Sequence, residues 1–266
     1  MTWIYALPLW LFAPLTILTI CALSYAGLAL VARHVRERVA LTHNDVAGPI
    51  ITIAGTVLAV MLSFMVVAVW QEYDAAANNV QSEASDVTDL DHLAGAFPQP
   101  QRETLQALIR QYADDVVRDE WPLMRVGKRS VDVQRLTASI QQTVLSYRPK
   151  SVSQQQLVVQ AAALTQAFID ARRQRLFSND QGIPLLMWAC MLFVGIVTVG
   201  FIYLFRVESF TAHVLMTLGT AAIIGATFVL IAEMDYPFRG TSAIRPTAFI
   251  AVRATIDDVN NTSGFY

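Results

Sequence analysis

The amino-acid sequence predicts an all-α integral membrane protein with four transmembrane helices and a helical-bundle insert between the second and third. Hydrophobic residues make up 55% of the 266-residue chain and charged residues only 15%, against about 25% charged in ordinary soluble domains. The mean hydropathy is +0.44. Four apolar runs are each close to the roughly 20 residues that cross a bilayer as a helix. These runs lie at about 9–32, 47–70, 183–205 and 211–233.

The first two spans are joined by a short polar loop, and the last two by only about five residues. Such short connections predict two antiparallel helical hairpins. The chain therefore divides into a transmembrane hairpin at 1–70, an extramembrane insert at 71–182, a second hairpin at 183–233 and a C-terminal segment at 234–266. No basic residue precedes the first apolar run, which is longer than the hydrophobic region of a signal peptide. We therefore expect it to be a retained span.

The second span carries a face of small residues. It has no charge from Ala47 to Trp70, and 71–93 contains neither Pro nor Gly, so one helix is predicted to cross the membrane and continue beyond it. Within the span, small side chains recur every three or four residues: Gly48, Thr52, Gly55, Ala59 and Ser63. Such a face can admit another helix closely, within one protomer or between protomers. Alternatively, it can line a pore that an apolar constriction gates.

The insert is predicted to be helical throughout. After the continuation of span two, a turn leads to a helix at about 101–121, which Pro122 is expected to end. Ser130 is the predicted N-cap of a third helix. Ser153 and Gln156 have the spacing of a capping box that opens a fourth helix, which ends near Phe177. Four helices of these lengths predict a bundle.

The charges of the insert are segregated along the chain. The stretch 72–91 carries six acidic residues and no basic one. Three arginines lie near the end of the fourth predicted helix: Arg172, Arg173 and Arg175. If that helix returns antiparallel to the first, these arginines approach Glu72 and Asp74. We hypothesise ion pairs there, at the membrane surface, that fasten the bundle to the spans.

The last span ends in the run Asp-Tyr-Pro-Phe-Arg-Gly at 235–240. Asp235 is unfavourably placed at a helix C-terminus, so a basic partner is expected, either Arg239 or one of the three arginines of the insert. Pro237 ends the helix and Gly240 permits a turn. After this turn, Thr247–Val259 has the pattern of a short amphipathic helix that lies at the membrane interface.

The basic residues of short loops predict the orientation of membrane proteins. Four of them lie in the two short loops: Arg33, Arg36, Arg38 and Arg206. On the opposite side, Arg239 and Arg245 lie near span ends, with Arg253 at the edge of the range. This distribution favours cytoplasmic short loops, with the insert and both termini outside. We expect a multi-pass protein of a bacterial inner (plasma) membrane.

The sequence contains no motif of an enzyme or a metal centre. No phosphate-binding loop, nucleophile elbow, zinc-protease helix or paired Cys/His spacing occurs in it. We therefore expect no enzyme activity, no cofactor and no metal. The net charge of −2 gives no reason to expect a nucleic-acid partner. The spans hold no Asp, Glu, Lys or Arg until their ends, which disfavours an ion-coupled transporter but not a passive pore.

Several residue runs follow one another along the chain: His-Asn-Asp-Val-Ala-Gly at 43–48, Trp-Gln-Glu-Tyr-Asp at 70–74, Glu-Trp-Pro at 120–122, Ala-Arg-Arg-Gln-Arg-Leu at 171–176, Pro184 with Trp188, and Asp-Tyr-Pro-Phe-Arg-Gly at 235–240. Taken in order, these runs resemble the bestrophin-like family of bacterial membrane proteins over nearly the whole chain. The resemblance implies four spans with a large insert between the second and third. Through the bestrophin anion channels it also implies a homo-oligomer with an apolar pore neck.

One part of the bestrophin pattern is missing. In bestrophins an acidic run that clasps calcium follows Pro-Phe-Gly, whereas here Pro237, Phe238 and Arg239 lead through Gly240 into Thr-Ser-Ala-Ile-Arg-Pro. Calcium gating is therefore not implied for this chain. The acidic stretch 72–91 would favour cations if it lay at a pore mouth, so the sign of the permeant ion stays open.

We expect the protein to be a passive ion channel or channel-like pore, with inorganic ions, membrane lipid and further copies of itself as partners. Span two is the candidate pore or packing helix. The alternative is a non-conducting membrane scaffold or envelope sensor whose helical insert binds a partner. Ion flux through the purified protein separates the two.

Overall fold

The computed structural model describes residues 7–34, 44–205, 207 and 209–263. All regular structure in these ranges is helical, as the sequence predicts. The elements are α1 (Leu9–His34), α2 (Asn44–Ala94), α3 (Gln101–Asp115), the π-helix η3 (Val116–Glu120), α4 (Trp121–Arg125), α5 (Val131–Ser146), α6 (Val152–Asp180), α7 (Leu185–Tyr203), α8 (Phe210–Met234) and α9 (Thr247–Ser263). Arg36, Arg38 and Arg206, which enter the predicted orientation, lie outside the described residues.

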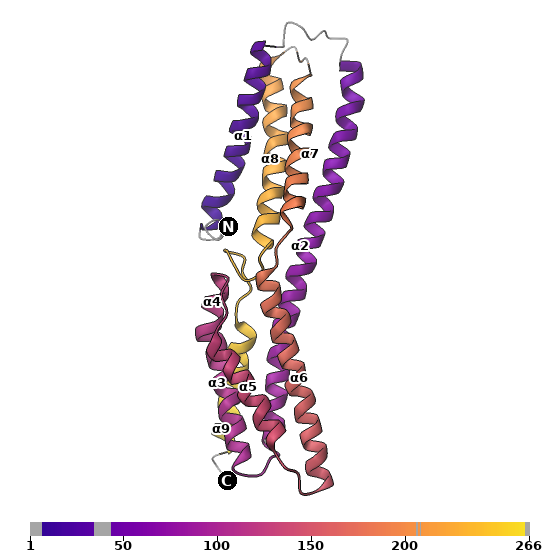
Figure 1. Cartoon of the computed structure of the whole chain (residues 1–266). Helices are drawn as coiled ribbons and strands as arrows, with labels where there is room; N and C mark the ends of the chain where they lie inside the picture. The colour runs from indigo at the N-terminus through magenta and orange to yellow at the C-terminus, as the bar shows by residue number, and fades with distance from the viewer. Residues whose placement is uncertain (1–6, 35–43, 206, 208, 264–266) are drawn as a thin grey trace. The chain divides into compact units, whose positions relative to one another are not determined.

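The chain folds into two compact units (Figure 1). The membrane unit comprises the chain up to Gln71 and Gly182–Asp235, and the insert unit comprises Glu72–Gln181 and the chain from Tyr236 onward. Helix α2 is continuous over 51 residues, so its first part belongs to the membrane unit and its second part to the insert unit.

Four helices of the described chain are long and apolar enough to cross a membrane: α1, α2, α7 and α8. Each of the four includes most or all of one predicted span, and the predicted class of a four-span membrane protein is confirmed. Helix α8 packs against both α1 and α7 (Figure 1). The residues of α2 that are buried in this unit recur at helical spacing and are Leu58, Leu62, Met65 and Val69.

The contact of α1 with α8 depends on a glycine. A Cβ at Gly225 of α8 would lie 3.3 Å from the Cα of Ile17 in α1, whereas a Cβ at Gly219 of the same helix would meet nothing within 4 Å. Small residues at such crossings let two membrane helices approach closely.

Substitution of Gly225 by leucine is therefore expected to lower the free energy of unfolding in detergent by about 1–3 kcal/mol, the usual range for overpacking. Gly219→Leu places the same side chain on the same helix without a clash and should leave stability nearly unchanged. Thermal unfolding of the two purified variants measures the difference. Equal losses in both would show that the α1–α8 contact tolerates the larger side chain.

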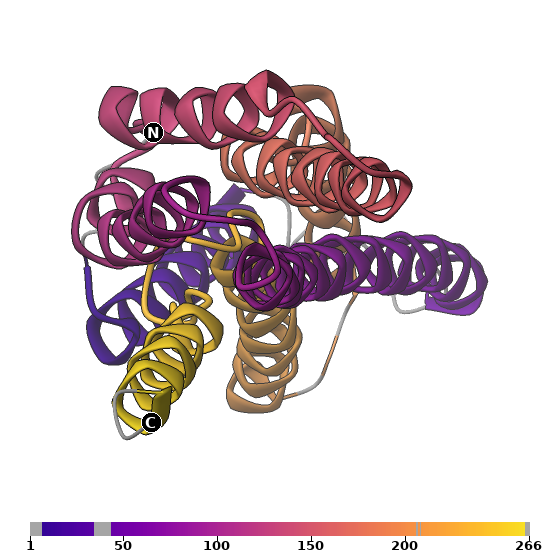
Figure 2. The same cartoon turned by 90° about the horizontal axis from the view of Figure 1, so that it is seen from below.

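The insert unit is a helical bundle around one core (Figures 1 and 2). Helix α3 packs against α5 and α9, and α5 packs against α6. The largest fully buried apolar side chains of this core include Phe97, Tyr112, Phe168, Phe238 and Phe249. The hydroxyl of Tyr73 and the indole Nε1 of Trp121 donate to backbone oxygens of Ser242 and Ile244, which attaches the segment after α8 to this bundle.

The structure differs from the predicted insert in its helix boundaries. Pro122 does not end the second helix, because a proline in the first turn of a helix needs no backbone N–H. It lies at the start of α4, directly after the π-helix η3. The N-cap of α5 is Ser130, as predicted. The cap of α6 is Ser151, whose hydroxyl accepts from the backbone N–H of Gln154 at 3.2 Å, and not the expected Ser153.

Helix α9 also differs from its prediction. Its apolar residues Phe249, Val252 and Ile256 are buried in the core of the insert unit, and do not face a membrane interface. The amphipathic pattern is the same for both locations. The pattern therefore identified the helix but not the surface that its apolar side covers.

Candidate functional site

The small-residue face of α2 is open within the protomer. A Cβ at Gly48 or Gly55 would meet nothing within 4 Å, and Thr52, Ala59 and Ser63 are exposed. The buried positions of this helix lie on a different face. Packing among the described residues of one protomer therefore does not account for the small residues.

The hydroxyl groups on this face already have hydrogen-bond acceptors. Thr52 donates to the backbone oxygen of Gly48 at 3.0 Å, and Thr56 donates to that of Thr52 at 2.8 Å. Each hydroxyl oxygen keeps lone pairs that can accept from water or contact a cation. The face is thus mildly polar but carries no charge.

A groove of about 590 Å³ lies between α2, α7 and α8. Three residues of the small face line it: Gly55, Ala59 and Ser63. Opposite them, α7 contributes Thr198 and α8 contributes Thr220 and Thr227, among aliphatic side chains. The lining of the groove is therefore uncharged and carries scattered hydroxyl groups.

A buried network of charges occupies the centre of the insert unit. Arg175 of α6 is fully buried and binds Glu83 of α2 through two hydrogen bonds, Nε to Oε2 at 2.6 Å and Nη2 to Oε1 at 2.9 Å. Its Nη2 also donates to Oε2 of Glu120 at 2.8 Å. The hydroxyl of Tyr112 donates to Oε1 of Glu83 at 2.5 Å. Two-point contacts of this kind hold a guanidinium in one orientation.

Arg172 extends the network by one turn of α6. Its Nη2 donates to Oε1 of Glu120 at 2.5 Å, and its Nη1 donates to Gln134 of α5 at 2.7 Å. Glu120 is the last residue of the π-helix η3, which changes the phase of the chain relative to a regular α-helix. This one irregular turn brings Glu120 between Arg172 and Arg175.

Aromatic rings and opposite charges stabilise the network. The guanidinium of Arg175 lies 5.2 Å from the ring centroid of Trp121 and 5.8 Å from that of Phe249, within cation–π range. Burial alone would lower the pKa of Arg175, but the carboxylate of Glu83, joined by that of Glu120, raises it well above its ordinary value. Burial, joined by the charge of Glu83, likewise raises the pKa of Tyr112. Both groups therefore keep their protons at every physiological pH.

The arginines take other partners than the expected Glu72 and Asp74. Both of those acidic residues are exposed, and Asp74 accepts a hydrogen bond from Asn78 at 3.1 Å. Arg173 is also exposed and pairs with Asp170, three residues before it, at 3.0 Å. Arg172 and Arg175 pair instead with Glu83 and Glu120, which are buried beside them. An unpaired charge at such buried positions would strongly destabilise the fold.

In the turn after α8, Asp235 and Arg239 form hydrogen bonds with different backbone groups. Oδ1 of Asp235 accepts from the backbone N–H of Ile183 at 2.5 Å. Arg239 is buried, and its Nη2 donates to the backbone oxygen of Asn179 at 2.7 Å. Its guanidinium also lies 4.3 Å from the ring centroid of Tyr236.

Glu83 and Glu120 are buried partners that were not predicted from the sequence. Glu83 lies three residues after Val80 and four before Val87, on the apolar stripe of α2. A carboxylate on such a stripe is a signal that a buried cation faces it. Glu120 had no comparable signal, because its position depends on the π-helix.

Among the described residues, no group of three His, Cys, Asp or Glu side chains could hold a metal ion.

Asp91 is a buried carboxylate outside the network. It is 3% exposed and its Oδ1 has no partner among the described residues. Burial raises its pKa above the ordinary 3.8, although His92 and Arg110 oppose this. The folded state thus binds the proton of Asp91 more tightly than the unfolded state does, and this carboxylate destabilises the fold at neutral pH.

Asp91→Asn is therefore expected to raise the free energy of unfolding at pH 7. This advantage should disappear as the pH falls through the raised pKa towards 3.8, because the wild-type carboxyl then becomes neutral as well. Unfolding of both proteins across this pH range measures the difference between them. A difference that does not change with pH would contradict a raised pKa at Asp91.

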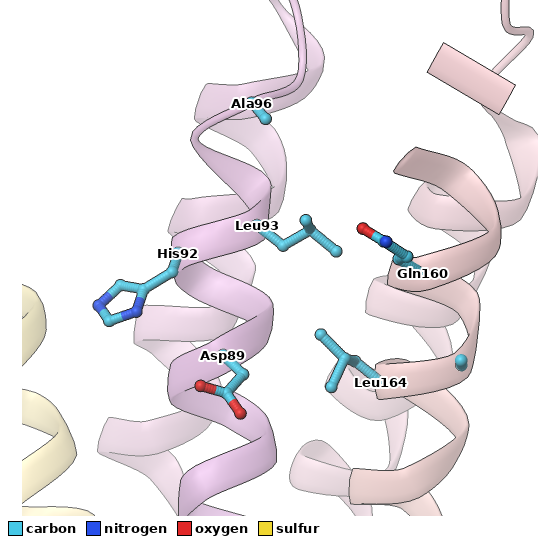
Figure 3. A pocket seen from close by; sticks show the side chains of 7 residues that line it. Asp89, His92, Leu93, Ala96, Gln160 and Leu164 are labelled. Atoms are coloured by element: carbon cyan, nitrogen blue, oxygen red, sulfur yellow. The ribbon is translucent and has the colours of Figure 1, made fainter. Parts of the chain in front are cut away.

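A second groove lies in the insert unit between α2 and α6, with a volume of about 580 Å³. Leu93 of α2 and Leu164 of α6 point into the space between the two helices, while His92 points away from α6 (Figure 3). Asp89 and Gln160 add polar groups to a mainly apolar lining.

Nearly the whole chain is similar to known proteins, both in sequence and in fold. A family model described as a bestrophin-like domain matches residues 6–249. Among solved structures, a variant of a bacterial bestrophin homologue from Klebsiella pneumoniae is similar with a TM-score of 0.68 at 10% identity, covering 93% of this chain and 98% of that one. A second variant of that homologue gives 0.69 at 9% identity, covering 92% and 98%. Among curated proteins, none matches the sequence.

Proposed function

Because the chain belongs to the bestrophin-like family, we propose that it forms a homo-oligomeric passive ion channel or channel-like pore in the membrane. The fold that it shares with the bacterial bestrophin homologue from Klebsiella pneumoniae supports this proposal. The resemblance to bestrophin channels implies a ring of protomers around a central pore.

The open small-residue face of α2 carries the proposal for this chain. The face is uncharged, holds the hydroxyl groups of Thr52 and Ser63, and has space beside Gly48 and Gly55. In an oligomer, such a face either lines the pore or lets a helix of a second protomer approach closely. In both cases a bulky residue there should alter conduction.

Ion flux through the purified protein tests the proposed function. The oligomeric state in detergent is measured first by light scattering, and the oligomer is then reconstituted into liposomes with a chloride or a potassium gradient. We expect an oligomer whose flux depends on voltage, membrane tension or pH. A well-folded oligomer that passes neither ion under any of these conditions would refute the channel.

The groove between α2 and α6 supports a second candidate function, a non-conducting scaffold or envelope sensor whose insert binds a partner. Its apolar lining and its volume of about 580 Å³ suit an apolar peptide segment. A partner whose capture requires Leu164, together with the absence of flux, would favour this function over the channel.

The orientation in the membrane is a separate part of the proposal. The basic residues of the two short loops favour a cytoplasmic position for those loops, with the insert on the other side. Reporter fusions after Arg38 and within 122–130 test this orientation. Activity of a cytoplasmic reporter at 122–130 would show that the insert is cytoplasmic. The channel proposal would then stay unchanged.

A further inference from the structure

Arg239 is a buried cation in the turn after α8. Its side chain is 9% exposed and forms no ion pair with any described carboxylate. The backbone oxygen of Asn179 and the ring of Tyr236 are its contacts, at 2.7 Å and 4.3 Å. A buried charge without an opposite charge is strongly destabilising. The other buried arginines of this unit, Arg172 and Arg175, both have carboxylates.

Asn179 adds unpaired polar atoms at the same place. It is fully buried in the last turn of α6, and neither its Nδ2 nor its Oδ1 has a partner among the described residues. The Nε of Arg239 is also unpaired and buried. Buried amide groups are nearly always hydrogen-bonded. Asp180, the next residue along the chain, cannot supply the missing charge, because it is paired with Arg129.

The backbone around Arg239 limits the size of any ligand. A Cβ at Gly127 would lie 2.8 Å from its Nη2, so the guanidinium is held directly against the backbone there. Gly127 has a φ of 71°, a conformation that side-chain-bearing residues rarely adopt. This close contact leaves no room for a ligand between the guanidinium and the backbone of Gly127, so a ligand of Arg239 has to approach from the side of the unpaired Nε.

We propose that Arg239 and Asn179 form a binding site for one small inorganic anion of the size of a halide. The Nε–H of Arg239 and the Nδ2–H of Asn179 are its donors, and the guanidinium supplies the positive charge. Hydrogen bonds from a charged donor to an anion are short and strong. A water molecule could accept the same hydrogen bonds, but it would leave the charge of Arg239 uncompensated. The site does not depend on ion conduction by the protein.

Bromide is a suitable probe, since it replaces chloride and scatters anomalously. A crystal of the full-length protein grown in sodium bromide should show an anomalous peak within hydrogen-bond distance of Arg239 Nε and Asn179 Nδ2. In solution, bromide should raise the melting temperature of the purified oligomer relative to sodium gluconate, as binding to the folded state requires.

Asn179→Asp is the decisive variant, because its carboxylate supplies the missing negative charge from within the chain. It should remain folded and lose at least about tenfold in bromide affinity, the equivalent of one charge-assisted hydrogen bond. Arg239→Gln should lose the same response if it folds. Arg173→Gln, which removes an exposed arginine of α6, is the matched control and should respond to bromide like the wild type.

Two results would overturn the anion site. One is a water molecule beside Arg239 without anomalous scattering in bromide. The other is an unchanged bromide response of Asn179→Asp. Neither readout measures flux, so a protein that binds bromide here but passes no ions would refute the channel and keep this site.

Discussion

Replacement of Arg175 by methionine is expected to lower the free energy of unfolding by about 3–5 kcal/mol, the cost of breaking a buried ion pair on one side. The substitution leaves the carboxylates of Glu83 and Glu120 fully buried, and only the hydroxyl of Tyr112 still donates to Glu83. Methionine fills a similar volume, so a cavity contributes little to the loss. Chemical or thermal unfolding of the full-length protein in detergent measures the effect.

Arg173→Met provides the matched control, since it makes the same change two residues earlier in α6. Arg173 is exposed and pairs with the exposed Asp170, so the expected loss is below about 1 kcal/mol. Adding Glu83→Gln to Arg175→Met should recover part of the stability, because one buried charge is then removed. Similar small losses for Arg175→Met and Arg173→Met would show that the network contributes little to folding.

Ala59→Trp is expected to change ion flux strongly while the protomer stays folded. Ala59 is exposed on the small-residue face of α2 and lines the groove beside α7 and α8. The structure therefore has room for the indole ring inside one protomer. If this face lines the pore or the contact between protomers, the ring narrows the passage or separates the protomers. Flux in liposomes and the oligomeric mass in detergent distinguish these two effects.

Phe64→Trp is the control for this prediction. Phe64 is 72% exposed and lies on another side of the same helix, so a large aromatic ring is already present at that place. The variant should conduct and assemble like the wild type. Normal flux and normal oligomeric mass in Ala59→Trp would show that the small-residue face of α2 neither lines the pore nor forms the contact between protomers.

The spans and most of the insert could be predicted from the sequence because their signals are local. An uncharged apolar run of membrane length reads as a span whatever its neighbours are. The start of α5 at Ser130 follows from a side chain that caps its own helix. The continuation of α2 to Ala94 follows in the same way from the absence of Pro and Gly after the span.

The charge network could not be predicted because its partners come from separate helices. Spacing along the chain showed that Arg172 and Arg175 lie together, but not which carboxylates face them. That choice depends on how α6 packs against α2 and on the π-helix that places Glu120. A π-turn has no reliable sequence pattern, since it is one extra residue in an otherwise ordinary helix.

The burial of the charge network has a consequence for the ionic environment of the protein. Dissolved counter-ions screen exposed charges over about 8 Å at physiological salt, so the surface pairs Asp132–Arg135 and Asp170–Arg173 weaken as salt rises. The pairs of Arg172 and Arg175 are at most 3% exposed, and counter-ions do not reach them. A protein that passes ions, as proposed here, would experience changing salt concentrations, and the core of its insert would keep its strength through them.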